Sequence, residues 1–532
     1  MSLALISVAE LKAALHDGEE LALLDAREEV PFDKRHLLMA SCLPLGRIEL
    51  LASELLPRED VRVVWCDGGE GLAERAATRL LELGYSNVSV LDGGVSAWED
   101  AGHSVYSGVH VPSKAFAEVV EHEAQTPWID AAELKGMMDA KADMVIVDTR
   151  SYEEYHVNSI PGAISVPGAE IVYRINDIAP SEHTTVVVNC GGRTRSIIGA
   201  QALINAQIPN KVVSLKNGTQ DWHLYGYEVI KGATRVAPEV SSEGLKRAHE
   251  GAVNVAELCD VRALRKDEFL QWRHESSHRT TYFLDVRTHD EYVEGHVPGT
   301  KHIAGGQLIQ ETDRHLAVWG ARVVLFDNDG VRATLTASWL KQMGWDVVTV
   351  TCDVAGGATE QGMYRAIVQG LDSSRVKHIT PAGLKQKLQD GEAVVIDLNW
   401  SKSYYEGHIP QAWYAIRSRL DEDLSNVPEK KHLVFTSPNG VLAAVAAADR
   451  AAQDDSVLAL EGGTAAWRIA GYPLNAGAEN MASLAEDIRL KAREEHSDIE
   501  AAMRAYLAWE IQLLHDMARD DDHRFQVVAP GG

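Results

Sequence analysis

The chain has 532 residues, which at roughly 100–200 residues per domain predicts three to five domains. A composition of 45% apolar and 24% charged residues excludes a largely disordered or fibrous protein. The net charge of −27 disfavours nucleic acid and anionic membranes as partners, so an anionic substrate needs a local positive site.

A strand that ends in aspartate occurs four times along the chain. In order, the copies are 23–25, 145–148, 283–285 and 395–397, and the first three continue as Asp-x-Arg. A second strand later in each repeat enters a tight loop, at 63–66, 187–190, 324–327 and 433–436. A turn before a helix carries Trp98, Trp222 and Trp467, which we expect to anchor that helix on the sheet. Short β-branched runs that alternate with helices are typical of βα units and a parallel sheet.

The sequence therefore predicts four tandem α/β domains, each a mainly parallel sheet flanked by helices, plus a C-terminal amphipathic helix. The expected domains are 1–108, 128–233, 258–370 and 378–478, and the helix is expected within 482–524. Apolar residues recur there at three- and four-residue steps. We expect this helix to pack on the domains or to form a dimer seam rather than to take part in chemistry.

Compartment and metal content are suggested by what the sequence lacks. No apolar run reaches the ~18–20 residues of a membrane span, and the start of the chain lacks the layout of a signal peptide. The chain has five cysteines and no Cys-x-x-Cys pair. This pattern predicts a reducing, cytoplasmic setting without a disulfide framework, and neither a metal site nor a cofactor is expected.

The order of the motifs resembles that of the rhodanese domain. It runs Asp-x-Arg, Glu-Tyr-x-x-Gly-His-Val-Pro-Gly, a cysteine loop, and Gly-Gly-x-x-x-Trp. With four copies, the chain is similar to a multi-domain rhodanese-family sulfurtransferase, and the resemblance covers all but the C-terminal helix. It implies an enzyme that carries a sulfane sulfur as a cysteine persulfide, with Cys190 at the persulfide position.

The loop of the second repeat has the residues that this chemistry needs: Cys190, Gly191, Gly192, Arg193, Thr194 and Arg195. A strand enters it and a helix follows, so its backbone N–H groups can converge on one anion, beside the partial positive charge of the helix N-terminus. Arg193, Arg195 and an approaching Arg150 are expected to favour the thiolate of Cys190. The thiolate is expected to attack the outer sulfur of thiosulfate, release sulfite and hold a persulfide that cyanide or a thiol removes.

The loops of the other repeats depart from this pattern. Cys66 in the first repeat is followed by Asp67 and Glu70, whose carboxylates should raise the thiol pKa and repel thiosulfate. Cys66 is therefore predicted to be structural, with a role as a second thiol as the alternative. The third repeat has Asp327 at the nucleophile position, and the fourth has Thr436-Ser437, with neither Cys nor Arg. We expect one catalytic domain and three degenerate ones, with Cys42, Cys259 and Cys352 inert.

Two other functions compete with sulfur transfer. Rhodanese-like domains also occur as dual-specificity phosphatases, but those have one residue more between Cys and Arg than the stretch from Cys190 to Arg195. A non-catalytic scaffold or a thiol or persulfide sensor is the other alternative, because three of the four domains are degenerate. Two arginines suit a compact dianion, so thiosulfate is the expected donor, with mercaptopyruvate or a persulfide as alternatives. A protein acceptor and a homodimer stay open.

Overall fold

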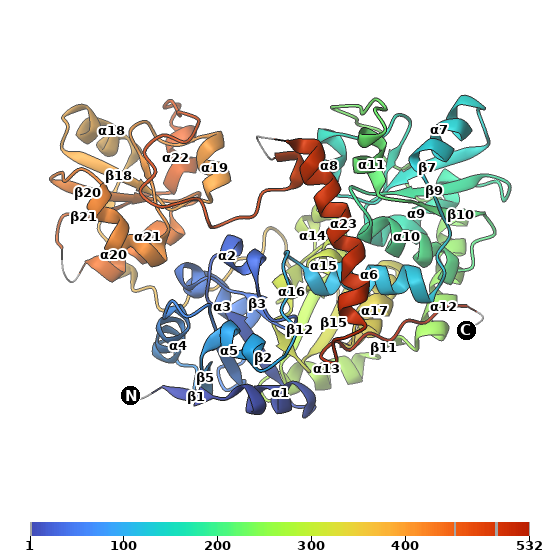
Figure 1. Ribbon diagram of the computed structural model, residues 1–532, viewed down its shortest axis with the longest axis horizontal. Coiled ribbons are helices and arrows are strands. Elements are labelled where there is room, and N and C mark those ends of the chain that lie inside the picture. Colours follow the sequence, from blue (N-terminus) through green and yellow to red (C-terminus); the bar gives the residue numbers. More distant parts are fainter. Residues whose placement is uncertain (1–2, 452–453, 495–497, 531–532) are drawn as a thin grey trace.

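The structure is a computed structural model that describes residues 3–451, 454–494 and 498–530. Four α/β repeats follow one another along the chain, coloured from blue to orange in Figure 1. The strands of each repeat's own sheet are parallel, with three central strands between two short edge strands. The predicted fold class is confirmed, including a C-terminal helix.

The first two repeats are built alike. The first has strands β1 (Ala4–Ile6), β2 (Leu21–Asp25), β3 (Ser41–Cys42), β4 (Val63–Cys66) and β5 (Val88–Leu91), and helices α1 (Val8–His16), α2 (Glu29–Lys34), α3 (Ile48–Leu55), α4 (Leu72–Glu82) and α5 (Gly94–Asp100), with the 3-10 turn η1 (Leu45–Arg47). The second has β6 (Trp128–Ile129), β7 (Met144–Asp148), β8 (Ile164–Ser165), β9 (Thr185–Asn189) and β10 (Val212–Leu215), and α7 (Ala131–Asp139), α8 (Tyr152–Val157), η2 (Gly168–Glu170), α9 (Ile171–Ile178), α10 (Thr194–Asn205) and α11 (Gly218–Leu224).

The last two repeats follow the same plan. The third has β11 (Arg262–Ala263), β12 (Thr281–Asp285), β13 (Lys301–His302), β14 (Val318–Trp319), β15 (Arg322–Asp327) and β16 (Asp346–Thr351), and α13 (Lys266–Glu275), α14 (His289–Glu294), α15 (Gly305–Gln310), α16 (Thr312–His315) and α17 (Val331–Gln342). The fourth has η3 (Ser373–Arg375), β17 (His378–Ile379), β18 (Ala393–Asp397), β19 (Trp413–Tyr414), β20 (His432–Thr436) and β21 (Val457–Leu460), and α18 (Pro381–Gln389), α19 (Ser401–Glu406), η4 (Arg417–Arg419), α20 (Leu420–Asp423), η5 (Leu424–Asn426), α21 (Val441–Arg450) and α22 (Gly463–Ile469).

Three helices lie outside the repeats: α6 (Val111–Glu123), α12 (Ser242–Cys259) and α23 (Ile499–Met517), the last preceded by η6 (Ala492–Glu494). Sequence analysis assigned no element to the connections that form α6 and α12. Helix α6 is buried along most of its length and packs against α10 and α23. Helix α12 packs against α9 and α17 and so joins the second and third repeats. No helix among the described residues combines the length and apolar character needed to cross a membrane.

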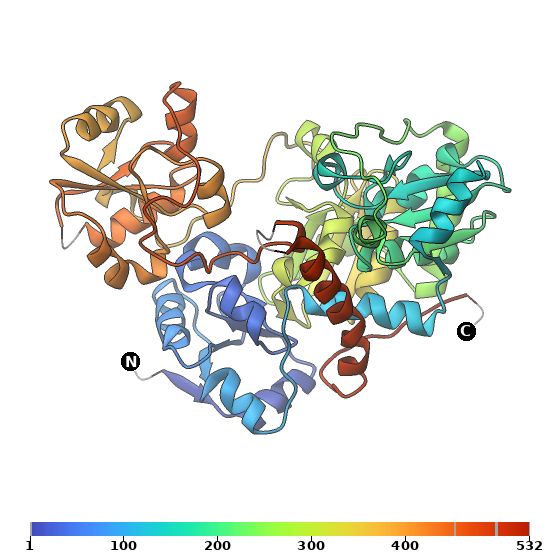
Figure 2. The ribbon, with the colours of Figure 1, turned by 45° about the horizontal axis from the view of Figure 1, so that its top comes forward.

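The repeats also pack in pairs, one of neighbours in sequence and one of the two repeats at the ends of the series. The second and third meet at glycines, where a Cβ on Gly306 would lie 3.0 Å from the backbone nitrogen of Gly168. The first and fourth meet through Arg417 and the buried Glu49, 2.5 Å apart. Strand β14 of the third repeat joins the sheet of the first repeat, antiparallel to β2. One apolar core extends through the first three repeats, whereas the fourth repeat has clusters of its own. Figure 2 shows the fourth repeat above the first repeat.

Strand register determines which residues are equivalent between repeats. Within each sheet, the strand-final aspartate pairs with a residue at or next to the end of the strand before the loop: Asp25 with Cys66, Asp148 with Asn189, Asp285 with Phe326, and Asp397 with Thr436. The residue after that partner is thus Asp67, Cys190, Asp327 or Ser437. This corrects the alignment of two repeats by one residue, because Cys66 and Thr436 correspond to Asn189 rather than to Cys190.

The predicted tryptophan anchors are confirmed. Trp98, Trp222 and Trp467 are all buried in their repeats. Each donates its ring N–H to a backbone carbonyl further along the chain, at 2.8 to 3.0 Å. This satisfies the polar atom of a large apolar side chain and fixes the short helix on the sheet.

Candidate active site

Cys190 follows β9 and lies at the base of the loop, with 2% of its surface exposed. Its Sγ lies 3.5 Å from Oγ of Ser196, which in turn donates to the carbonyl of Arg193 at 2.8 Å. The loop is held against the turn before α11 by the carbonyl of Cys190, which accepts the N–H of Thr219 at 2.9 Å. Gly218 in that turn has φ +56°, and a Cβ there would lie 2.4 Å from the same carbonyl, so only glycine fits.

In the other three repeats, a side chain fills the space enclosed by the loop. The residue at the Cys190 position accepts the backbone N–H of the residue six positions later: Asp67 from Ala73 at 3.0 Å, Asp327 from Ala333 at 2.8 Å and Ser437 from Ala443 at 3.2 Å. In the second repeat, by contrast, no acceptor among the described residues takes the backbone N–H groups of residues 191–195. Backbone N–H groups that lack an acceptor beside the one thiol at this position are what an anion nest requires.

The charge nearest the thiol comes from Arg195. Its Nη1 lies 2.6 Å from Glu154 Oε2 on α8 and 3.3 Å from Oε1 of Gln307 on α15. Burial raises the pKa of Cys190 above its ordinary value, and Arg195 and Ser196 lower it by less. Arg195 thus favours the thiolate as expected, but burial outweighs it, and the pKa of Cys190 stays above its ordinary value.

The other two arginines that we expected near the substrate are already paired. Arg193 donates from Nε and Nη2 to the carboxylate of Glu118 on α6, at 2.6 and 2.7 Å, and also contacts Glu121. Arg150 donates from Nε and Nη2 to Asp148, at 2.9 and 2.7 Å. Both are almost fully buried. They hold the loop to the fold, and their roles in binding the substrate stay predictions.

Helix α23 brings two residues to the loop that sequence analysis missed. Thr194 Oγ1 donates to Glu510 Oε1 at 3.2 Å, and the hydroxyl of Tyr506 donates to the same oxygen at 2.9 Å. The helix crosses the molecule beside α6, as Figure 1 shows in red and cyan. No local motif marks Glu510, because its partner Thr194 lies 316 positions away.

Cys66 lies inside the first repeat and is fully buried. Burial raises the pKa of its thiol well above the ordinary value, and the carboxylate of Asp25 raises it further. The described cysteines form no disulfide. Burial likewise raises the pKa of Cys259 and of Cys352 to about 11. At neutral pH these three thiols are therefore protonated and poor nucleophiles.

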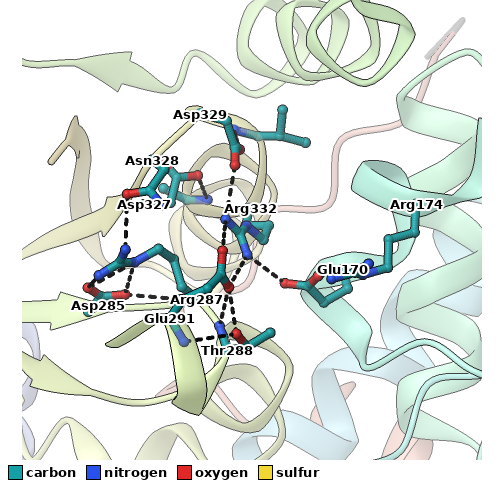
Figure 3. A network of polar contacts seen from close by, with 12 residues as sticks. Glu170, Arg174, Asp285, Arg287, Thr288, Glu291, Asp327, Asn328, Asp329 and Arg332 are labelled. Carbon is teal, nitrogen blue, oxygen red and sulfur yellow. Dashed lines mark hydrogen bonds and ion pairs between the residues drawn. The ribbon is translucent and has the colours of Figure 1, made fainter. Parts of the chain in front are cut away.

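The third repeat shows what the loop becomes without its thiol (Figure 3). Arg332 stands where the second repeat has Arg195, and it contacts Glu291 at 2.7 and 3.0 Å, as Arg195 contacts Glu154. Arg332 also reaches Glu170 of the second repeat at 3.1 Å. This loop is closed by its own side chains, and Arg332 forms part of the contact with the second repeat.

One group of potential metal ligands is found among the described residues: His16, Asp521 and Asp522. The ammonium group of Lys12 lies 2.5 Å from Asp521 and 2.6 Å from Asp522. A cation is thus already supplied by the chain, and the group lies apart from the cysteine loop.

The fold and this loop define the class of protein. The family described as Rhodanese-like domain matches the chain at residues 7–101, 130–225, 250–359 and 380–470, one match for each repeat. The chain therefore belongs to the rhodanese-like family and carries four copies of its domain in tandem.

Among solved structures, the chain is similar over its whole length to a thiosulfate sulfurtransferase from Pseudomonas aeruginosa. The two are 43% identical, the TM-score is 0.94, and the match covers 99% of this chain and 100% of that one. Shorter matches include "HTH-type transcriptional regulator Rv0324" (31% identical over 105 residues) and "Probable adenylyltransferase/sulfurtransferase MoeZ" (35% over 96 residues), both of Mycobacterium tuberculosis. These cover 20% and 18% of this chain, and the chain spans only 45% and 24% of the two relatives.

Proposed function

We propose that the protein is a thiosulfate sulfurtransferase that carries a sulfane sulfur on Cys190. The observation that carries the proposal is the set of backbone N–H groups without an acceptor beside the thiol of the second repeat, where the equivalent loops are capped by Asp67, Asp327 and Ser437. The thiosulfate sulfurtransferase from Pseudomonas aeruginosa, similar over the full length, supports the choice of donor.

The reaction follows from the chemistry of the thiolate. The sulfur of Cys190 attacks the outer sulfur of thiosulfate, the bond between the two donor sulfurs breaks, and sulfite leaves with the electron pair. The outer sulfur of the persulfide is then negatively charged inside the nest, where backbone N–H groups and the guanidinium of Arg195 stabilise it. Cyanide or a thiol attacks this outer sulfur next, and Cys190 departs as a thiolate.

The glycine at position 192 leaves room at the entrance of the loop. A Cβ on Gly192 would lie 2.9 Å from Glu510 Oε2 and 3.3 Å from the ring of Tyr506, so the entrance admits no larger residue. The loop from Cys190 to Arg195 also keeps the short spacing that favours a single sulfur over a phosphate group.

The experiment that tests the proposal is the intact mass of the protein after brief exposure to thiosulfate. The parent should gain one sulfur atom, about 32 Da, and the Cys190→Ser variant should gain none. Cys66→Ala is the matched control, because it removes another buried thiol and should take up sulfur like the parent. No gain in the parent would exclude thiosulfate as donor, and a failure with mercaptopyruvate and persulfides as well would favour a non-catalytic scaffold.

A further inference from the structure

A buried carboxylate oxygen without a partner faces the entrance of the cysteine loop. Glu510 is 1% exposed, and its Oε1 accepts two hydrogen bonds while its Oε2 has no partner among the described residues. Oε2 would lie 2.9 Å from a Cβ on Gly192, and the amide of Gln220 lies 3.4 Å from the same point. The Oε1 of Gln220 is also buried without a partner. Two unsatisfied oxygens at one glycine indicate a place where a polar group from outside the chain binds.

The other carboxylates around the loop are already engaged. Glu118 holds Arg193, Asp148 holds Arg150, and Glu154 holds Arg195. Among these carboxylates, Glu510 is the one whose second oxygen lacks a partner among the described residues and can accept a proton. On the opposite side, the hydrogen bond from Cys190 ends at Ser196, whose own hydroxyl proton is directed to the Arg193 carbonyl, so no base lies there.

We propose that Glu510 accepts the thiol proton of Cys190 and passes it to the departing sulfite. The inference rests on the proposed function. As the proton moves to Oε2, through one water or an oxygen of the bound donor, the sulfur lone pair attacks the outer sulfur of thiosulfate. The donor S–S bond then breaks and sulfite leaves. The proton on Oε2 moves to sulfite and converts it to hydrogensulfite, which leaves Glu510 ionised again. Overall, the thiol and the thiosulfate dianion become a persulfide anion and the hydrogensulfite monoanion.

Charged and titratable groups from three parts of the chain surround Glu510. Lys114 and Glu118 of α6, Cys190 and Arg193 of the loop, and Tyr506 of its own helix face it. Burial raises its pKa, while Lys114, Tyr506, Arg193 and Thr194 oppose that rise.

The test is the pH dependence of single-turnover persulfide formation in the full-length protein. Glu510→Gln keeps the shape and the hydrogen bonds to Thr194 and Tyr506 but cannot take the proton. We expect persulfide formation to be about 100-fold slower near pH 7 and to rise only at higher pH, where the thiol ionises by itself. Glu500→Gln is the control, since it makes the same change on the same helix at a residue that is 60% exposed.

Alkylation of Cys190 by iodoacetamide separates a proton acceptor from a neighbouring charge. The negative charge of Glu510 raises the pKa of Cys190, so its removal should speed alkylation while it slows persulfide formation. If Glu510→Gln takes up sulfur at the rate and with the pH profile of the parent, or speeds both reactions, the inference is wrong although the sulfurtransferase stands. If the parent takes up no sulfur, the proposed function fails as well.

Discussion

Asp67, Cys190, Asp327 and Ser437 stand at the same place in their repeats, and the oxygen or sulfur that they carry determines whether the loop is filled. A short carboxylate or hydroxyl reaches the backbone N–H at the start of the next helix and caps it. Cysteine leaves the N–H groups of residues 191–195 without an acceptor among the described residues. The loop of the second repeat therefore keeps backbone N–H groups without a partner in the chain, and these groups can bind an anion.

Gly192→Ala tests how tightly this site is enclosed. The added Cβ would lie 2.9 Å from Glu510 Oε2, so the loop or α23 must shift, and we expect persulfide formation to slow about tenfold or more. Gly191→Ala is the matched control, because its Cβ would meet nothing closer than Arg150 Cδ at 3.6 Å. Equal rates for the two variants would contradict the enclosed geometry.

A pH-dependent loss of stability is expected from Asp397, which lacks the arginine that pairs with the equivalent aspartates. Burial raises its pKa to about 7, and its Oδ2 has no partner among the described residues. The neutral form is favoured in the fold, so its contribution to stability is full below about pH 4 and is lost as the pH rises to about 7.

Asp397→Asn should therefore be more stable than the parent at pH 8, by up to about 4 kcal/mol, and equal to it near pH 4. Thermal unfolding at several pH values measures this difference. Asp148→Asn is the contrasting variant, since it breaks the ion pair with Arg150 and should destabilise at pH 8. A pH-independent difference for Asp397→Asn would show that the carboxyl is not the cause.

At this scale the sequence allowed much of the site to be predicted. The strand-final aspartates, the loop of Cys190 and the degenerate loops all follow from local patterns. The one-residue error in the first repeat arose because Cys66 is a conspicuous residue, whereas equivalence depends on which residue pairs with Asp25 across the sheet. The partners of Arg193 on α6 were equally hidden, since they come from a segment to which no element was assigned.

The helices outside the repeats are the elements that complete the site. Helix α6 supplies Glu118 to Arg193, and α23 supplies Glu510 to Thr194. The amphipathic pattern predicted that α23 exists, but a pattern of apolar residues indicates only that a face is buried, not against what. The expectation that it packs on the domains is confirmed by the hydrogen bond from Thr194 of the second repeat to Glu510.

Leu513→Ala tests whether α23 covers the thiol. Leu513 is buried against the core, and its truncation should cost about 2–5 kcal/mol and loosen the helix. We expect alkylation of Cys190 to become several-fold faster. Ile511→Ala is the control on the same helix, because Ile511 is exposed and should change neither quantity. Unchanged alkylation of Leu513→Ala would mean that the loop is reached from another side.

In the whole molecule, polar contacts join the repeats in two pairs. The second and third repeats face each other through Arg195 with Gln307 and Arg332 with Glu170, as in Figure 3 for the latter. The first and fourth meet through Arg417, which contacts the buried Glu49 at 2.5 and 2.8 Å. Such contacts between repeats could not be read from a sequence whose repeats differ at these positions.

Arg417→Ala should loosen the fourth repeat without affecting sulfur uptake. It leaves Glu49 with Arg79 alone, at a cost of about 2–4 kcal/mol, and calorimetry should show an earlier transition for this repeat. Arg450→Ala removes an ion pair to the exposed Asp421 and should cost under about 1 kcal/mol. Loss of persulfide formation in Arg417→Ala would show that the contact between the first and fourth repeats affects the loop of the second repeat.

The central claim is that one of the four loops performs the chemistry. Its most direct test is the amount of sulfite released per chain in a single turnover with excess thiosulfate, together with the peptide that carries the sulfur. We predict one sulfite per chain and a persulfide on the peptide of Cys190. A second equivalent, or sulfur on the peptide of Cys66, would contradict the assignment of the active repeat.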